Sequence, residues 1–109
     1  QVFFNLLMNA IEAMPKGGVI TIKTYKMAPS ESSLDNRLCV IEITDNGEGI
    51  LKRNLRKLFE PFFTTKRDKK GIGLGLFMAK MIVNNHKGDL VIDSKLGKGA
   101  TAKIILPLS

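Results

Sequence analysis

Apolar residues recur at helical spacing in three stretches of the chain. In the first stretch, one side of the expected helix is apolar, and Pro15 with Gly17 and Gly18 then ends the pattern. The third stretch ends near Gly88. We therefore predict helices over residues 2–14, 51–59 and 76–85.

Four other stretches are rich in β-branched residues and predict strands. In the second of them, Cys39, Ile41 and Ile43 lie on one face. The last two strands flank the glycine-containing turn 95–99, so we expect a hairpin. Two polar segments, 28–37 and 64–70, have the composition of loops. The predicted strands cover residues 19–25, 38–44, 90–93 and 101–106.

This order of elements suits one domain built in two layers. The chain has 109 residues, of which 44% are hydrophobic, enough for one packed core. We predict an α/β fold, a two-layer α/β sandwich in which a mixed sheet carries its helices on one face. The first residues are already helical in pattern with no cap before them, so we expect a fragment of a longer protein.

The charge of the chain is strongly basic and unevenly placed. Its formal net charge is +7, and eight of the 17 basic residues lie between Lys52 and Lys70. Such a cluster suits a polyanionic partner, either a nucleotide or a nucleic acid, and equally a solvated surface with no partner. The single Cys39 excludes an internal disulfide and favours a reducing, cytoplasmic setting.

Polar residues on the first helix are candidates for metal binding. Asn5, Asn9 and Glu12 are spaced i, i+4 and i+7, so they form one stripe beside the apolar face. In an isolated helix this is most simply a solvent-facing edge. One amide oxygen, that of Asn9, is nevertheless sufficient for Mg²⁺ when phosphate and water supply the other ligands.

Asp45 follows a strand and begins the sequence Asp-Asn-Gly-Glu-Gly. A carboxylate fixed at a strand end accepts a hydrogen bond from an exocyclic amine such as that of adenine, and it repels the carbonyl of guanine. Gly47 and Gly49 allow the backbone to approach a flat base. Taken alone, Asp-Asn-Gly is also an ordinary turn sequence.

A glycine-rich segment precedes the third helix. In Gly71-Ile-Gly73-Leu-Gly75 the backbone N–H groups are unshielded, and a helix start favours anions. Phosphate binding is one interpretation and a flexible joint is the other. The basic residues just before this segment favour phosphate. Three aromatic residues, Phe59, Phe62 and Phe63, precede them and are expected to pack in the core.

These motifs occur in an order that resembles the N, G1, F and G2 boxes of the ATP-binding domain of two-component sensor histidine kinases. The resemblance covers nearly the whole chain and implies the Bergerat fold. It implies that Asn9 binds Mg²⁺, that Asp45 reads the adenine amine and that residues 64–70 form an ATP lid. The ATP-binding residues it implies are Asn5, Asn9, Asp45, Gly47, Gly49, Ile50, Phe63, Lys66, Gly71, Gly73, Leu74, Gly75 and Thr101.

Position 5 bears on the reaction. Hydrolysing relatives carry Glu there as a base, whereas Asn5 cannot take a proton, so the resemblance favours kinase chemistry. Three positions depart from the family pattern, one of them Ala102, where many relatives have an aromatic residue. Many relatives have a basic residue in place of Glu12 and a hydroxyl residue in place of Ala100. We expect Thr101 to substitute for the missing hydroxyl.

The phospho-accepting histidine of these kinases lies on a separate dimerising helical hairpin, and the only histidine here, His86, is not in that context. No catalytic residue is therefore assigned, and we expect no autophosphorylation by these 109 residues alone. The resemblance implies three partners or ligands: Mg²⁺-ATP, a phosphoacceptor domain in a dimeric parent protein, and a response regulator. It leaves open whether that parent is membrane-anchored. The alternatives are a related ATPase or anti-sigma serine kinase, and a basic nucleic-acid-binding module.

Overall fold

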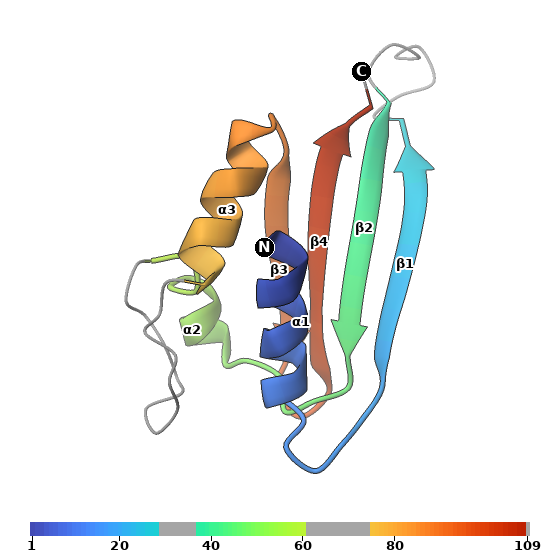
Figure 1. Ribbon diagram of the computed structural model, residues 1–109. Helices are drawn as coiled ribbons and strands as arrows, with labels where there is room; N and C mark the ends of the chain where they lie inside the picture. The colour runs from blue at the N-terminus through green and yellow to red at the C-terminus, as the bar shows by residue number, and fades with distance from the viewer. Residues whose placement is uncertain (29–36, 61–74, 109) are drawn as a thin grey trace.

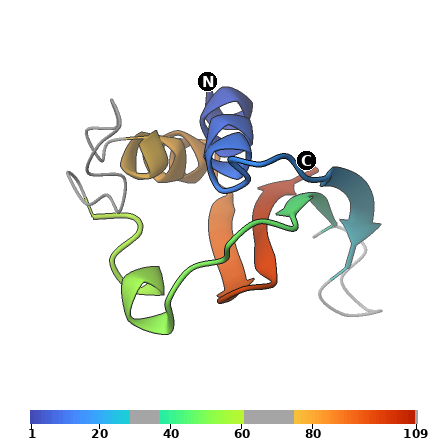
Figure 2. The ribbon, with the colours of Figure 1, turned by 90° about the horizontal axis from the view of Figure 1, so that it is seen from below.

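The computed structural model describes residues 1–28, 37–60 and 75–108. Its elements are the helices α1 (Val2–Glu12), α2 (Lys52–Leu55) and α3 (Gly75–Asn85), and the strands β1 (Ile20–Met27), β2 (Leu38–Asp45), β3 (Asp89–Lys95) and β4 (Gly99–Pro107). Figure 1 shows α1 and α3 side by side on one face of the sheet, running in opposite directions. Figure 2 shows the same two helices in one layer and the strands in the other, so the predicted two-layer α/β sandwich is confirmed.

The sheet has the strand order β1-β2-β4-β3, and all of its pairings are antiparallel. The prediction of a mixed sheet was wrong for these described strands. The helical connection from β2 to β3 does make these two strands parallel, as a crossover should. However, β4 turns back from β3 and lies between them, so the two parallel strands are not neighbours.

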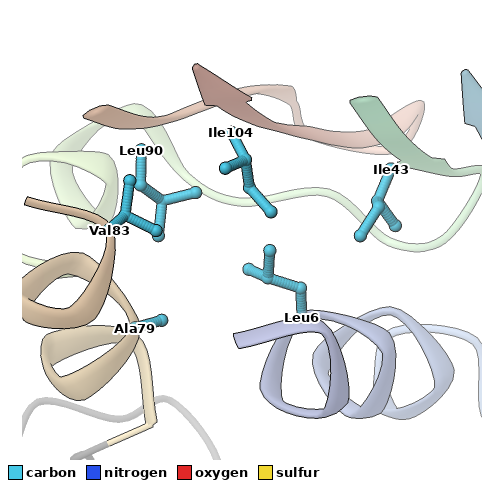
Figure 3. Packing of buried hydrophobic residues seen from close by; sticks show 6 residues of the cluster. All are labelled: Leu6, Ile43, Ala79, Val83, Leu90 and Ile104. Carbon is cyan, nitrogen blue, oxygen red and sulfur yellow. The ribbon is translucent and has the colours of Figure 1, made fainter. Parts of the chain in front are cut away.

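The core lies between the helices and the sheet. Leu6 on α1 points toward Ile43 and Ile104, while Ala79 and Val83 on α3 lie near Leu90 (Figure 3). Each of these side chains is at most 3% exposed. Burying one large apolar side chain contributes roughly 1.5–3 kcal/mol, so these few contacts fix both helices on the sheet.

The boundaries of the helices mostly follow the local sequence. Helix α1 ends at Glu12, and Met14 and Gly17 continue as turns, with Gly17 at φ +92°. Helix α3 ends at Asn85, where the ring nitrogen Nδ1 of His86 lies 2.8 Å from the Ile82 carbonyl oxygen. The helix predicted over residues 51–59 is shorter, since α2 has 4 residues and turns follow it.

Strand β1 lies at an edge of the sheet and most of its side chains are exposed. Cys39 on β2 is half-buried. Within the described ranges, no helix is long and apolar enough to cross a bilayer.

Candidate functional site

The Asp45 carboxylate is buried at the end of β2, with 8% of the residue exposed. It follows Ile41 and Ile43, which pack on the helix side of the sheet, so strand alternation directs Asp45 to the same side. Its oxygen Oδ1 accepts the backbone N–H of Gly47 at 2.9 Å. The loop that follows the strand therefore fixes the orientation of this acid.

This loop, residues 46–50, is pressed against the end of α1. The backbone N–H of Glu48 donates to the Ala13 carbonyl oxygen at 3.1 Å. A Cβ atom at Gly47 would lie 2.5 Å from that same oxygen, so only glycine fits there. The loop is thus held in place by close contact between its own backbone and the backbone at Ala13.

The other side of the loop contacts the turn between β3 and β4. The N–H of Gly97 donates to the Glu48 carbonyl oxygen at 2.7 Å. Gly49 has φ +75°, and a Cβ atom there would lie 2.2 Å from the Lys95 carbonyl oxygen. Gly47 and Gly49 therefore both lie where the loop backbone packs closely against another segment. The sequence alone did not predict these contacts.

Asn5 on α1 contacts the beginning of α3, and Asn9 lies between Asn5 and the end of the helix that contacts this loop. The Asn5 side-chain N–H donates to the Gly75 carbonyl oxygen at 3.2 Å, which places α1 beside the first residue of α3. Asn9 follows one turn later on the same side of the helix, and Ala13, which contacts Gly47, lies one turn after that. The distance from Asn5 to Ala13 is about 12 Å along the helix axis. This side of the helix leads from the start of α3 to the loop after Asp45.

The register of the sheet corrects one predicted site residue. Ala100, not Thr101, lies opposite Asp45. Thr101 lies opposite Thr44 on the other face, where their hydroxyl oxygens are 3.0 Å apart. A shift of one residue in a strand reverses the face, so Thr101 does not replace a hydroxyl at position 100.

The face that carries Thr101 has a hollow of about 350 Å³. Residues of β2, β3, β4 and their turn line it, and no residue of α1 does. It therefore lies apart from α1, although Asp45 belongs to its lining as well as to the site beside that helix. Its lining consists of Glu42, Thr44, Asp45, Asp93, Ser94, Lys95, Lys98, Gly99, Ala100, Thr101 and Lys103.

Five predicted ATP-binding residues lie outside the described residues: Phe63, Lys66, Gly71, Gly73 and Leu74. The expected lid, residues 64–70, lies outside them as well. Ile50 belongs to the described loop, and its N–H donates to the Ser94 hydroxyl at 2.9 Å. Of the predicted set, the structure thus brings together Asn5 with Gly75, and Asp45 with Gly47, Gly49 and Ile50.

Two polar residues near these segments were missed by the sequence analysis. Ser94 holds Ile50 as described, and Lys80 on α3 donates to Asp89 Oδ1 at 2.7 Å and to the Leu90 carbonyl oxygen at 2.8 Å. The Lys80 ammonium also lies 4.7 Å from the centre of the Phe59 ring, a cation–π contact. These partners are distant in sequence, so no local pattern predicts them.

The hydrogen bond from Lys80 lowers the pKa of Asp89 below its ordinary value. The two side chains are 29% and 55% exposed, so water screens this pair. Of the basic cluster, four described members, Lys52, Arg53, Arg56 and Lys57, are exposed. Within the described ranges no three His, Cys, Asp or Glu side chains group as a metal site.

Comparison with known proteins shows the family of this chain. All 109 residues match the model of the family described as histidine kinase-, DNA gyrase B- and HSP90-like ATPase. Sporulation kinase C of Bacillus subtilis is 44% identical over 108 residues, which are 99% of this chain and 23% of that protein. The signal transduction histidine-protein kinase AtoS of Escherichia coli is 41% identical over 109 residues, all of this chain and 16% of that protein.

Solved structures with the same fold include a mycobacterial sensor histidine kinase, MprB. It superposes with a TM-score of 0.79 at 31% identity, covering 97% of this chain and 67% of that one. The catalytic domain of the histidine kinase ThkA gives a TM-score of 0.76 at 29% identity, over 98% of this chain and 65% of that one. The chain spans less than a quarter of the two kinases named above from sequence. Because the family model matches the whole chain, and because the relatives and solved structures named here are histidine or sporulation kinases, this chain belongs to the histidine kinase-, DNA gyrase B- and HSP90-like ATPase family.

Proposed function

We propose that this chain binds Mg²⁺-ATP and is the catalytic domain of a sensor histidine kinase. In this proposal the γ-phosphoryl group passes to a histidine on a separate helical domain, and then to a response regulator. The observation that carries the proposal is a series of contacts: Asp45 binds the Gly47 N–H, the loop 46–50 contacts the end of α1, and Asn5 of α1 contacts the start of α3. Family membership and the similarity to named histidine kinases support it.

Asp45 is the residue proposed to select the base. Its carboxylate is buried and already oriented by the Gly47 N–H, so little reorganisation accompanies binding. A fixed acceptor favours the exocyclic amine of adenine over the carbonyl of guanine. Ala100, opposite Asp45, has a small side chain that leaves room beside the carboxylate.

The phosphates are proposed to lie toward the start of α3. Gly75 is the first residue of this helix of 11 residues, and a helix start attracts anions through its unpaired N–H groups and its dipole. Gly71 and Gly73, with Phe63, Lys66 and Leu74, complete the ATP-binding set in the proposal. The exposed basic residues Lys52 and Arg53 on α2 add positive potential at this side of the domain.

The donor set fits a metal ion that arrives with the nucleotide. Among the described residues no cluster of three acidic, His or Cys side chains exists, so an all-protein metal cage is not available there. Mg²⁺ takes one or two protein ligands and completes its shell with phosphate and water. We propose Asn9 as the protein ligand, and Mg²⁺ bound there would offset the charge of the phosphates.

Asn5 supports kinase chemistry over hydrolysis. Its amide cannot act as a general base, and it is already used to join α1 to the Gly75 carbonyl oxygen. The residues of this chain thus bind and position ATP, and the accepting histidine is supplied by another domain. The single cysteine and its free thiol agree with a reducing, cytoplasmic setting for the domain.

A thermal-shift series with ATP, GTP and Mg²⁺ tests the proposal. A ligand at about 100 times its Kd stabilises a protein by about 2.7 kcal/mol, which corresponds to a rise in Tm of about 10 °C or more for a domain of this size. We expect such a rise with ATP, a larger one with Mg²⁺ present, and a much smaller one with GTP. Equal shifts with ATP and GTP, or a response only to nucleic acid with steep salt dependence, would contradict the proposal.

A further inference from the structure

We propose that Ser94 is a positioning residue of the nucleotide site: its hydroxyl holds the loop 46–50 on the sheet and thereby keeps the Asp45 carboxylate oriented toward the base. This inference rests on the proposed function, because it assigns Ser94 a part in the same site.

Ser94 lies in one row with Asp45 across the sheet. Asp45 pairs with Ala100 and Ala100 pairs with Ser94, so the three residues lie side by side on β2, β4 and β3. Directly opposite residues in antiparallel strands lie on the same face, about 5 Å apart. Leu90, which is on the same face of β3 as Ser94, belongs to the core beneath the helices. Ser94 therefore lies on the face that carries Asp45.

The hydroxyl of Ser94 joins three segments of the chain. It accepts the N–H of Ile50 at 2.9 Å and donates its proton to the Gly99 carbonyl oxygen at 2.7 Å. A serine hydroxyl has one proton to give. Because that proton is committed to Gly99, Ser94 acts on the loop and does not donate to a ligand.

The effect on Asp45 is transmitted through the backbone. Ile50 ends the loop whose Gly47 N–H binds the Asp45 carboxylate at 2.9 Å. Gly99, the other partner of Ser94, is packed so tightly on β2 that a Cβ atom there would lie 2.1 Å from the Asp45 carbonyl oxygen. Ser94 thus holds both backbone segments that meet at Asp45. Without its hydroxyl, the Ile50 N–H loses its acceptor and the loop has one fewer tie to the sheet.

The experiment compares three variants of this chain: Ser94→Ala, Ser94→Thr and, as a matched control, Thr101→Val. Thr101 is a suitable control because its hydroxyl also makes a part-buried contact between sheet strands, but on the opposite face. Calorimetry gives the Kd for Mg²⁺-ATP and Mg²⁺-GTP, and Tm is measured without nucleotide. Hydrogen exchange of the Ile50 amide reports directly on the loop.

We expect Ser94→Ala to raise the Kd for ATP about three- to tenfold, as for loss of one hydrogen bond. The Kd for GTP should change less, so that discrimination between the bases falls, and the Ile50 amide should exchange faster. Ser94→Thr should restore both values because it keeps the hydroxyl. Thr101→Val should lower Tm without changing base discrimination.

Either of two binding results would overturn the inference while leaving ATP binding intact. One is an unchanged ATP to GTP ratio in Ser94→Ala, and the other is an equal loss of discrimination in Thr101→Val, which would mean that general destabilisation is the cause. If the unsubstituted chain fails to bind ATP, the proposed function itself is refuted, and the role of Ser94 with it. Exchange at Ile50 that does not change in Ser94→Ala would also refute the role, even if that variant is less stable.

Discussion

Replacing Asp45 by Asn separates base recognition from folding. The residue is 8% exposed, and one carboxylate oxygen accepts the Gly47 N–H at 2.9 Å. The amide oxygen of Asn can accept the same N–H, so the loop 46–50 should keep its position. The other end of the side chain changes from an acceptor to an N–H₂ donor.

The magnitude follows from the loss of a hydrogen bond to a charged group. Such a bond contributes about 1.5–3 kcal/mol, and an adenine amine would now meet a donor in place of its acceptor. We therefore expect the Kd for Mg²⁺-ATP to rise about 10- to 150-fold. The change in the free energy of unfolding without nucleotide should be small, since a buried charge is removed and the bond to Gly47 is kept.

Calorimetric titration with ATP and GTP, together with urea unfolding of the free protein, checks this. Guanine carries a carbonyl where adenine carries the amine, so the Kd for GTP should stay level or fall. Glu48→Gln is the matched control, because it neutralises an acid in the same loop whose described contacts are made by its backbone. The reasoning is refuted if Asp45→Asn binds ATP as tightly as the unsubstituted chain while remaining folded.

Four further predictions test other parts of the structure. Asn9→Ala should bring the Kd for ATP with Mg²⁺ close to the value without it, measured by titration in each buffer. Gly99→Ala should lower the free energy of unfolding by at least about 3 kcal/mol in a urea titration, because φ is +108° and the new Cβ would overlap backbone. Gly97→Ala, with φ +82° and open space around it, should cost only about 1–2 kcal/mol. The hydrogen bond from Lys80 lowers the pKa of Asp89. The stability that this bond contributes is therefore complete above the ordinary pKa of Asp, and it is lost as the pH falls through the lowered pKa of Asp89. Unfolding measured between about pH 5 and pH 2 should show that loss, and Asp89→Asn should remove it.

Features that depend on local spacing could be predicted from the sequence. Helices α1 and α3 and the four strands follow from apolar residues at intervals of three and four or of two. The short α2 shows the limit of this reasoning. After Leu55, the N–H of Lys57 donates to the Asn54 carbonyl oxygen, and the N–H of Glu60 donates to the Lys57 carbonyl oxygen. Each of these turns is closed by a hydrogen bond between residues three positions apart. Such turns place apolar side chains inward at nearly the same interval as an α-helix. The pattern of residues 51–59 therefore could not distinguish a helix from a series of turns.

Features that depend on register could not be predicted. Thr101 and Ala100 are neighbours in sequence, yet they lie on opposite faces of β4. The strand boundary was predicted at residue 101, whereas β4 begins at Gly99. The sequence position of Thr101 therefore suggested that its hydroxyl replaces the one missing at Ala100. In the sheet, however, the Thr101 side chain lies on the face opposite to Asp45. The contact between Asn5 and Gly75 joins residues 70 positions apart and has no local pattern either.

The position of Asp45 depends on the far end of the chain more than on its own neighbours. The loop after it has a glycine at each point of close approach, and its Asn46 side chain accepts the Val19 N–H at 2.9 Å. Glycine gives a loop freedom, and freedom would leave a base-reading carboxylate poorly oriented. Here that freedom is removed by backbone contacts with Ala13 on one side and with the turn 95–99 on the other. The glycines in this loop therefore allow close packing, and the rigidity that recognition needs comes from the end of α1 and from the hairpin formed by β3 and β4.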